Sequence, residues 1–366
     1  MRQGWTYREF EECLVKSAKA KQVKTSDYNE RGKYPIVSQE DKMVSGYCDD
    51  SSLLYHIDRP IVIFGDHTRV LKYVDFDFVV GADGVKILIP KDFLKARFLL
   101  YFLQWYKVPS LGYSRHYKLL KEIKLPIPPL AEQERIVAEL DLISSIIEKK
   151  KAQLKEYDQL AQSIFYNMFG DPITNEKGWE VQALSTVCDV RDGTHDSPKY
   201  VDNGYPLITS KNVVNGTISF DNVNLISERD LIAINARSKV DDGDIIMPMI
   251  GTIGKPTIVI KTREFAIKNV ALIKFSEAKR VLNIYIQKLL DSESYSRFIK
   301  EQNRGGTQKF ISLGMIRKLP TPIPPLPLQQ EFASKIEAIE RQKSLIQQSI
   351  VETQTLFDSR MDYWFG

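Results

Sequence analysis

Two segments of the chain repeat at a fixed spacing. The sequence Pro-Ile-Pro-Pro-Leu occupies residues 126–130 and again residues 322–326, which lie 196 positions later. The same spacing carries Phe169-Gly170 onto Phe365-Gly366 without a gap. Each half of the chain therefore ends in a segment of equal length that opens with a proline block and closes with Phe-Gly.

A long helical pattern follows each proline block. The apolar positions are Ile136, Leu140, Ile143, Ile147, Leu154, Tyr157, Ile164 and Met168 in the first segment and Phe332, Ile336, Ile339, Ile346, Ile350, Phe357, Met361 and Trp364 in the second. Their steps are three and four once Lys150 and Ala161 fill the gaps in the first segment and Lys343 and Thr353 those in the second. Such a pattern over about five heptads is typical of a coiled-coil seam. Proline cannot sit inside a helix, so each block marks a helix start and should itself be extended.

The two helical segments are predicted to pair with each other. Each is about 39 residues long, or roughly 58 Å at 1.5 Å per residue, and alone it would leave an apolar stripe in water. The residues between them, folded as one compact domain, return the chain more easily to the far end of the first helix. We therefore expect an antiparallel intramolecular coiled coil that joins two globular domains. The alternative is that each helix packs on its own domain.

Composition sets broad limits on the class of protein. The net charge of +4 and the pI near 8.6 are mildly basic, so a nucleic-acid surface would have to come from local patches. No apolar run approaches the length of a membrane span, and the first ten residues do not resemble a signal peptide. The three cysteines have no paired spacing, which predicts reduced thiols in a cytoplasmic protein.

The two globular regions repeat the same order of features. The predicted segments are a first domain at 1–125, a proline block with the first long helix at 126–170, a second domain at 171–321, and a proline block with the second long helix at 322–366. Each domain contains short β-branched runs, such as Tyr34–Val37 and Tyr205–Ile208, followed by a helix. We predict α+β domains, with a helical start around Tyr7 to Leu14 and one helix at 281–300.

Motifs of common catalytic centres are missing from the sequence. It contains no glycine-rich dinucleotide fingerprint and no phosphate loop, and its four histidines lack metal-ligand spacing. The acidic run Asp241–Asp244 is the nearest candidate for a nuclease site, but a turn before a strand is the favoured interpretation. We therefore expect a protein that is not itself an enzyme and that binds no cofactor or metal.

Polar residues in loops occupy matching places in the two domains. Arginine and lysine pair with guanine edges, asparagine and glutamine pair with adenine edges, and all of them bind phosphates. Solvated turns are the alternative for any single residue, but the matched sets favour DNA binding. The candidate DNA-binding residues are Ser38, Gln39, His67, Thr68, Arg69, Arg115, His116 and Lys118 in the first domain and Thr194, His195, Ser210, Lys211, Asn212, Thr252, Lys255, Lys268, Asn269, Arg304, Gln308 and Lys309 in the second.

Apolar side chains also lie outside the predicted seam of the first long helix. Leu160, Phe165 and Tyr166 fall on this outer face. They predict a docking surface for a protein partner.

The layout resembles the specificity subunit of type I restriction–modification systems. The residues that carry this resemblance are 125–137, with the proline block followed by Ala-Glu-Gln, the echo at 321–331, the run Asp192–Tyr200, and Gly251–Lys255. The resemblance extends over essentially the whole chain. The first domain departs from the pattern, since it has Gly65–Thr68 where the second has Gly251–Gly254.

The resemblance implies a division of labour between subunits. Each domain would read one half of a split double-stranded DNA target, and the helix pair would set the distance between the halves. Two methyltransferase subunits, and restriction subunits in systems that cleave DNA, would bind this chain. S-adenosylmethionine, ATP and magnesium would then belong to those partners. A coiled-coil scaffold with two protein-binding domains and no DNA role is the alternative.

Overall fold

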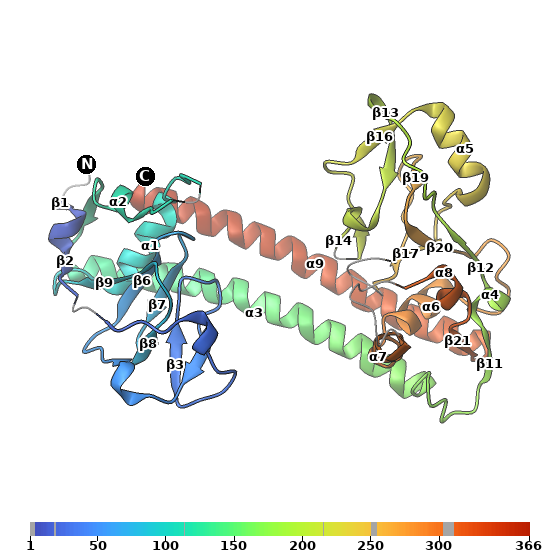
Figure 1. Cartoon of the computed structure of the whole chain (residues 1–366), viewed down its shortest axis with the longest axis horizontal. Coiled ribbons are helices and arrows are strands. Elements are labelled where there is room, and N and C mark those ends of the chain that lie inside the picture. Colours follow the sequence, from blue (N-terminus) through green and yellow to red (C-terminus); the bar gives the residue numbers. More distant parts are fainter. Residues whose placement is uncertain (1–3, 18–19, 113, 215, 250–254, 303–310) are drawn as a thin grey trace. The chain divides into compact units, whose positions relative to one another are not determined.

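The chain divides into two compact units. In the computed structural model, unit 1 comprises residues 1–152 and 347–366, and unit 2 comprises residues 153–346. The structure describes residues 4–366 apart from 18–19, 113, 215, 250–254 and 303–310. The long helices α3 (Leu130–Phe169) and α9 (Leu326–Phe365), green and red in Figure 1, each contribute residues to both units.

Unit 1 is built on two four-stranded sheets. One sheet has the order β2-β9-β6-β7, and the other has the order β4-β3-β8-β5. The central strand β6 is buried along its whole length, as expected for the run Ile-Val-Ile-Phe-Gly. The elements are β1 (Thr6–Glu9), β2 (Leu14–Val15), β3 (Tyr34–Val37), β4 (Gly46–Cys48), β5 (Leu54–Tyr55), β6 (Ile61–Gly65), β7 (Leu71–Val74), β8 (Phe78–Val80), β9 (Val85–Pro90), β10 (Lys124–Ile127), α1 (Ala96–Tyr106) and α2 (Tyr117–Leu120).

Unit 2 repeats this plan. Its first sheet has the order β12-β20-β17-β18, and its second has the order β16-β13-β19. The elements are β11 (Glu180–Ala183), β12 (Asp189–Asp192), β13 (Tyr200–Ile208), β14 (Val213–Val214), β15 (Thr217–Ile218), β16 (Asn224–Ile226), β17 (Ile245–Pro248), β18 (Thr257–Ile258), β19 (Ala266–Ile267), β20 (Val270–Lys274), β21 (Pro320–Ile323), α4 (Leu184–Val187), α5 (Glu228–Ser238), α6 (Asn283–Leu290), α7 (Glu293–Gln302) and α8 (Leu313–Arg317). The mixed α+β content and the duplication agree with the sequence prediction.

Two local predictions are wrong. The expected helical start around Tyr7 is the strand β1 followed by a 3-10 helix at Phe10–Cys13, because residues 6–9 pair with β10, more than 100 positions away. The single helix expected at 281–300 is two helices, α6 and α7, separated at Asp291 and Ser292. Tertiary pairing overrides the local amphipathic pattern in the first case.

Both proline blocks are extended, as predicted. The first block enters β10, which pairs antiparallel with β1, and the second enters β21, which pairs antiparallel with β11. The isolated two-stranded ribbons lie at equivalent places in the repeat, since β10 and β21 are 196 residues apart. Each ribbon therefore joins the segment before a unit's first sheet to the start of a long helix.

A buried glutamine holds the start of each long helix. The Oε1 atom of Gln133 accepts from the Lys95 amide at 2.8 Å, and its Nε2 atom donates to the Phe93 and Pro128 carbonyls at 2.8 and 2.9 Å. Gln133 is 0% exposed. One polar side chain thus connects the proline block to Lys95, the N-cap residue of the domain helix α1.

Gln329 repeats this arrangement 196 residues later. It accepts from the Leu282 amide at 2.9 Å and donates to the Arg280 and Pro324 carbonyls at 2.9 and 2.8 Å. Gln329 is also 0% exposed, and the helix that it contacts is α6. The repeat is therefore preserved at the level of individual hydrogen bonds.

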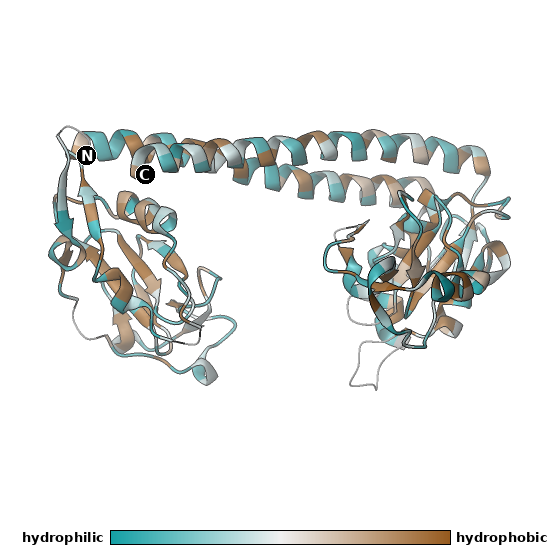
Figure 2. Ribbon diagram, turned by 90° about the horizontal axis from the view of Figure 1, so that it is seen from above, coloured by the Kyte–Doolittle hydropathy of each residue, from teal (hydrophilic) through white to brown (hydrophobic). Residues whose placement is uncertain are grey.

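The long helices pair antiparallel within each unit, as predicted. In unit 1 the Lys150 ammonium donates to Ser349 Oγ at 2.6 Å, and Glu139 pairs with Arg360. In unit 2 the Asp158 carboxylate lies 2.7 Å from the Lys343 ammonium. Hydrophobic and hydrophilic residues alternate along both helices in Figure 2, as a helix with one buried face requires. Residues that filled gaps in the apolar repeat, such as Lys150 and Lys343, make polar contacts across the pair.

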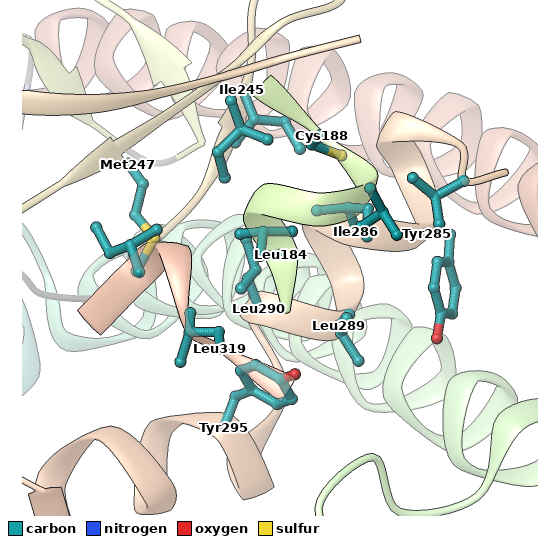
Figure 3. Packing of buried hydrophobic residues seen from close by; sticks show 14 of the residues in the cluster. Leu184, Cys188, Ile245, Met247, Tyr285, Ile286, Leu289, Leu290, Tyr295 and Leu319 are labelled. Carbon is teal, nitrogen blue, oxygen red and sulfur yellow. The ribbon is translucent and has the colours of Figure 1, made fainter. Parts of the chain in front are cut away.

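The last phenylalanine of each long helix enters the core of a unit. Phe365 lies 5.4 Å from Phe98 of α1, measured between ring centroids, and Phe169 lies 4.8 Å from Tyr285 of α6. Figure 3 shows Tyr285, Ile286 and Leu289 of α6 in the unit 2 cluster with residues from β17, α4 and α7. The Phe-Gly ends of the repeat are thus core residues in both units.

The cysteines and the helix lengths bear on the expectations from composition. Cys13, Cys48 and Cys188 are free thiols and are buried. In the part of the chain that the structure describes, no helix has the length and apolarity needed to cross a membrane.

The buried glutamines are testable. Gln133→Leu leaves one backbone amide and two backbone carbonyls without a partner in the core, so we expect unit 1 to lose about 2–4 kcal/mol of unfolding free energy. Denaturant unfolding followed by tryptophan fluorescence measures the change. Gln159→Leu, at an exposed position of α3, is the matched control, and equal stability of the two variants would contradict the assigned role.

Candidate nucleic-acid interface

In unit 1 the predicted binding residues lie where strands end. Strands β3 and β8 are parallel neighbours, with Ile36 opposite Val79, and the Gly81 amide donates to the Val37 carbonyl at 2.9 Å. Parallel strands end at the same edge, so the segment after Val37 meets the turn after Val80. This edge brings Ser38 and Gln39 beside residues 81–84.

Gln39 connects three of these loops. The side-chain Oε1 atom of Gln39 accepts from the His67 amide at 3.2 Å, and its Nε2 atom donates to the Asp83 carbonyl at 3.0 Å. The backbone carbonyl of Gln39 accepts from Thr68 Oγ1 at 2.6 Å. Gly84, at φ +93°, lets the chain pass this side chain, since a Cβ there would lie 2.7 Å from Gln39 Oε1. The structure therefore brings Gln39, His67 and Thr68 together, and the side-chain amide of Gln39 hydrogen-bonds two neighbouring loops.

Residues 115–118 adjoin the same loops. Arg115 pairs with Asp83 at 3.3 Å, and the His116 amide donates to the Asp66 carbonyl at 2.8 Å. Arg115 and Lys118 are exposed. Arg69, at φ +64°, donates from Nη1 to the Val108 carbonyl at 3.1 Å. Arg115 and Lys118 thus present positive charge at this edge, while Arg69 is tied to a neighbouring loop.

Two unit 1 predictions are corrected. His116 is 0% exposed; its Nδ1 atom lies 2.9 Å from the Asp66 carbonyl, and its Nε2 atom accepts from the Leu111 amide at 3.0 Å. Ser38 is 3% exposed, and its hydroxyl bonds that of Ser45. Both side chains are buried and make their hydrogen bonds inside the loops, so neither is exposed at the surface.

Unit 2 builds the equivalent edge from parallel strands β13 and β19. The Lys268 amide donates to the Ile208 carbonyl at 2.8 Å, and the Thr194 amide donates to the Ile267 carbonyl at 3.0 Å. These bonds bring together three segments that the sequence prediction named separately, at 194–195, 210–212 and 268–269. Lys211 is exposed, and Lys268 is half-buried with its Nζ atom 2.6 Å from Ser197 Oγ.

His195 lies between two oxygen atoms. Its Nε2 atom is 2.7 Å from Asp192 Oδ2, and its Nδ1 atom is 3.0 Å from Asn269 Oδ1. Hydrogen bonding to Asp192, followed by that to Asn269, raises the pKa of His195. Because both ring nitrogens face acceptors, the arrangement suits the doubly protonated imidazolium ion.

The remaining unit 2 predictions have mixed outcomes. Asn212 is corrected: it is 9% exposed, and its Oδ1 atom accepts from the amide and the hydroxyl of Thr209, which caps a short 3-10 helix. Lys255 is exposed and Ser210 half-buried. The predicted residues Thr252, Arg304, Gln308 and Lys309 lie outside the described residues.

The sequence prediction missed two cations. In unit 1 the Val23 amide donates to the Val80 carbonyl at 3.0 Å, as the Thr194 amide does to Ile267, so the exposed Lys24 stands where His195 stands in unit 2. Arg237, near the end of α5, donates to Asp192 Oδ1 at 2.7 Å. Neither has a sequence signal, because both depend on which distant strand the segment joins.

The described residues offer no candidate metal site. Among the described residues, no cluster of three or more histidine, cysteine, aspartate or glutamate side chains could hold a metal ion.

Comparison with known proteins identifies the family. The family described as type I restriction modification DNA specificity domain matches residues 3–156 and again residues 176–354. The chain belongs to this family. The two matched ranges account for most of the chain and correspond to its two repeats.

A relative and two solved structures are similar to this chain. The specificity subunit of the type I restriction enzyme MjaIX from Methanocaldococcus jannaschii is 25% identical over 287 residues, which cover 70% of this chain and 65% of that subunit. The match thus spans slightly less than two thirds of the relative's length.

The solved structures agree in fold. The S subunit of a type I restriction-modification system from M. genitalium has a TM-score of 0.55 at 14% identity, covering 98% of this chain and 95% of its own. A chain from a study of complex assembly and conformational transition of the type I R-M system also has a TM-score of 0.55 at 14% identity, covering 100% of this chain and 98% of its own.

The predicted docking surface on the first long helix is partly corrected. Leu160 is 46% exposed, but Phe165 is 2% exposed and packs against Tyr285 and Phe332 with ring centroids 6.0 and 5.8 Å apart. The Tyr166 hydroxyl lies 3.2 Å from Ser294 Oγ. The end of α3 contacts α6 as well as α9, so its buried face is wider than a heptad seam, and Phe165 is not available to a partner.

The titration of His195 tests the geometry of the unit 2 site. We expect its pKa to lie above the ordinary value of about 6.5, and Asp192→Asn to lower it, because the carboxylate stabilises the imidazolium ion. The stabilisation from this pair is fully present below pH 6.5 or so and is lost as pH rises through the folded-state pKa. Proton NMR of the imidazole, assigned by His195→Asn, measures both values.

The control for this titration removes a carboxylate from the same strand. Asp189→Asn changes a residue that instead pairs with Arg191 at 2.6 Å, and it should leave the pKa of His195 above the ordinary value. A wild-type pKa at or below that value would contradict the arrangement.

Proposed function

We propose that this chain is the DNA-reading subunit of a type I restriction–modification complex. The observation that carries the proposal is the pair of equivalent loop edges, at β3–β8 and β13–β19, on a duplicated fold of the DNA specificity family. Each edge would read one half of a split double-stranded target. Arg115, Lys118 and Lys24 would contact DNA in unit 1, and Lys211, Lys268, Asn269 and His195 in unit 2.

The proposed complex assigns the chemistry to other subunits. Methyltransferase subunits, two per chain, would dock on the outer faces of the long helices, where Leu160 and its repeat equivalent Leu356 are both exposed. Restriction subunits would join in systems that cleave DNA. S-adenosylmethionine, ATP and magnesium would bind to those partners, and this chain would contribute recognition in the cytoplasm. The presence of one recognition edge per repeat supports this assignment.

DNA binding should depend steeply on salt. Lysine and arginine contacts to phosphates release counterions, so we expect affinity for target DNA to fall by about tenfold or more between 50 and 200 mM salt. Fluorescence anisotropy of the assembled methyltransferase complex measures the slope, and sequencing of methylated adenines measures the target. We expect two short specific parts around a fixed unspecific gap. Salt-independent association without methylation would favour a coiled-coil scaffold.

We propose that the long helices set the length of the unspecific gap between the two specific parts of the DNA motif. Inserting seven residues at equivalent points in α3 and α9 keeps the heptad register and adds about 10 Å of helix, or roughly three base pairs at 3.4 Å each. The methylated motif should then keep both specific parts and lengthen its gap by whole base pairs. A seven-residue insertion into an exposed domain loop is the control. An unchanged gap in the helix variant would refute the spacer role.

A further inference from the structure

Arg237 connects helix α5 to the segment that carries His195. Its Nη2 atom donates to Asp192 Oδ1 at 2.7 Å and to the Gly193 carbonyl at 3.1 Å. The backbone carbonyl of Arg237 accepts from Arg191 Nη1 at 2.8 Å. The last turn of α5 is therefore tied to the end of β12 through both backbone and side chain.

Asp192 links Arg237 to two side chains of the candidate interface, His195 and Asn269. One carboxylate oxygen accepts from Arg237, and the other lies 2.7 Å from His195 Nε2. The opposite ring nitrogen of His195 faces Asn269 Oδ1 at 3.0 Å. The Asp192 side chain is 17% exposed, while those of Arg237 and His195 are each 62% exposed. A half-buried carboxylate thus aligns two exposed side chains, and its hydrogen bond with Arg237 is charge-assisted, which is the stronger kind.

Backbone contacts fix the position of the segment that carries His195, but they do not orient its side chains. Gly193 packs so closely on β19 that a Cβ would lie 2.4 Å from the Ile267 carbonyl oxygen. The Gly193 amide also donates to the Val270 carbonyl at 3.0 Å, and the Asn269 amide donates to the Thr194 carbonyl at 3.2 Å. These contacts define the path of the chain. The rotation of the His195 ring and of the Asn269 amide depends on Asp192 and Arg237.

A groove separates this segment from α5. It has a volume of about 530 Å³ and is lined by residues 194–198 on one side and by Asp230, Ile234 and Arg237 of α5 on the other. The Arg237 side chain lines this groove and donates to Asp192 and the Gly193 carbonyl. Loss of the guanidinium would therefore free the side chains of the segment without removing a core residue.

We infer that Arg237 is a positioning residue that determines which bases unit 2 reads, by holding Asp192 and through it His195 and Asn269. This inference rests on the proposed DNA-reading function. Bidentate recognition of adenine by asparagine needs both the oxygen and the nitrogen of the amide. The oxygen of Asn269 is engaged by His195, so its nitrogen is the group that donates to a base. Such a donor suits the acceptor atoms of guanine or thymine as well as adenine N7.

Methylation-site mapping of the assembled complex tests this role. We expect Arg237→Ala to relax one half of the split motif and to raise methylation of sites carrying a substituted base in that half by about tenfold, equivalent to about 1.4 kcal/mol of lost discrimination. The other half and the gap should not change. Asp192→Asn should relax the same half, since it breaks the same connection. Arg237→Lys should restore part of the discrimination.

The matched control is on the same helix. Arg229 is exposed in the first turn of α5, and Arg229→Ala should give the wild-type motif. Thermal unfolding of each variant reports whether it is folded, and Asp192→Asn and Arg237→Lys provide the test if Arg237→Ala does not fold.

Two outcomes would overturn the inference. One is an unchanged motif in folded Arg237→Ala or Asp192→Asn, with total methylation lowered equally at all sites, which would indicate a structural role. The other is relaxation of both halves together. Failure of the proposed function looks different, because the wild-type complex itself would then give no split motif.

Discussion

A buried glutamine amide holds each long helix to its domain, and much of the fold follows from it. The amide offers two donors and an acceptor, and it uses them on the proline block and on the start of the domain helix. Because the group is buried, its partners must occupy one geometry or leave polar atoms unpaired. The same three bonds recur at Gln329, so the entry of each long helix is set identically in both units.

The candidate interface depends on a second repeated constraint, a pair of parallel strands in each unit. Parallel strands end at the same edge, which gathers loops from distant parts of the sequence. Unit 1 then braces its loops with the neutral amide of Gln39, whereas unit 2 uses the ionic contact of Asp192 with Arg237 and His195. Charge pairs at partly exposed positions are screened by salt. The two units therefore differ in the side chain that joins most of these loops, which is a neutral amide in unit 1 and a carboxylate in unit 2.

The local character of some signals explains which predictions succeeded. Proline geometry and heptad spacing are properties of neighbouring residues, so the extended blocks, the two long helices and their pairing could be predicted. Gln39, His67, Lys268 and Asn269 were predicted as polar loop residues, and the structure places each of them just outside a strand. Ser38, His116 and Asn212 were polar residues in loops like the others, and nothing in the sequence distinguished a side chain turned inward from one turned outward.

The sequence by itself determined the duplication and the long helices, because repeats and periodicity are properties of the order of residues along the chain. The tertiary structure alone decided that residues 6–9 form a strand, that Phe165 enters a core, and that Lys24 and Arg237 join the candidate interface. Each of these depends on contacts between segments far apart in sequence. Their free energy comes from partners that no local pattern specifies.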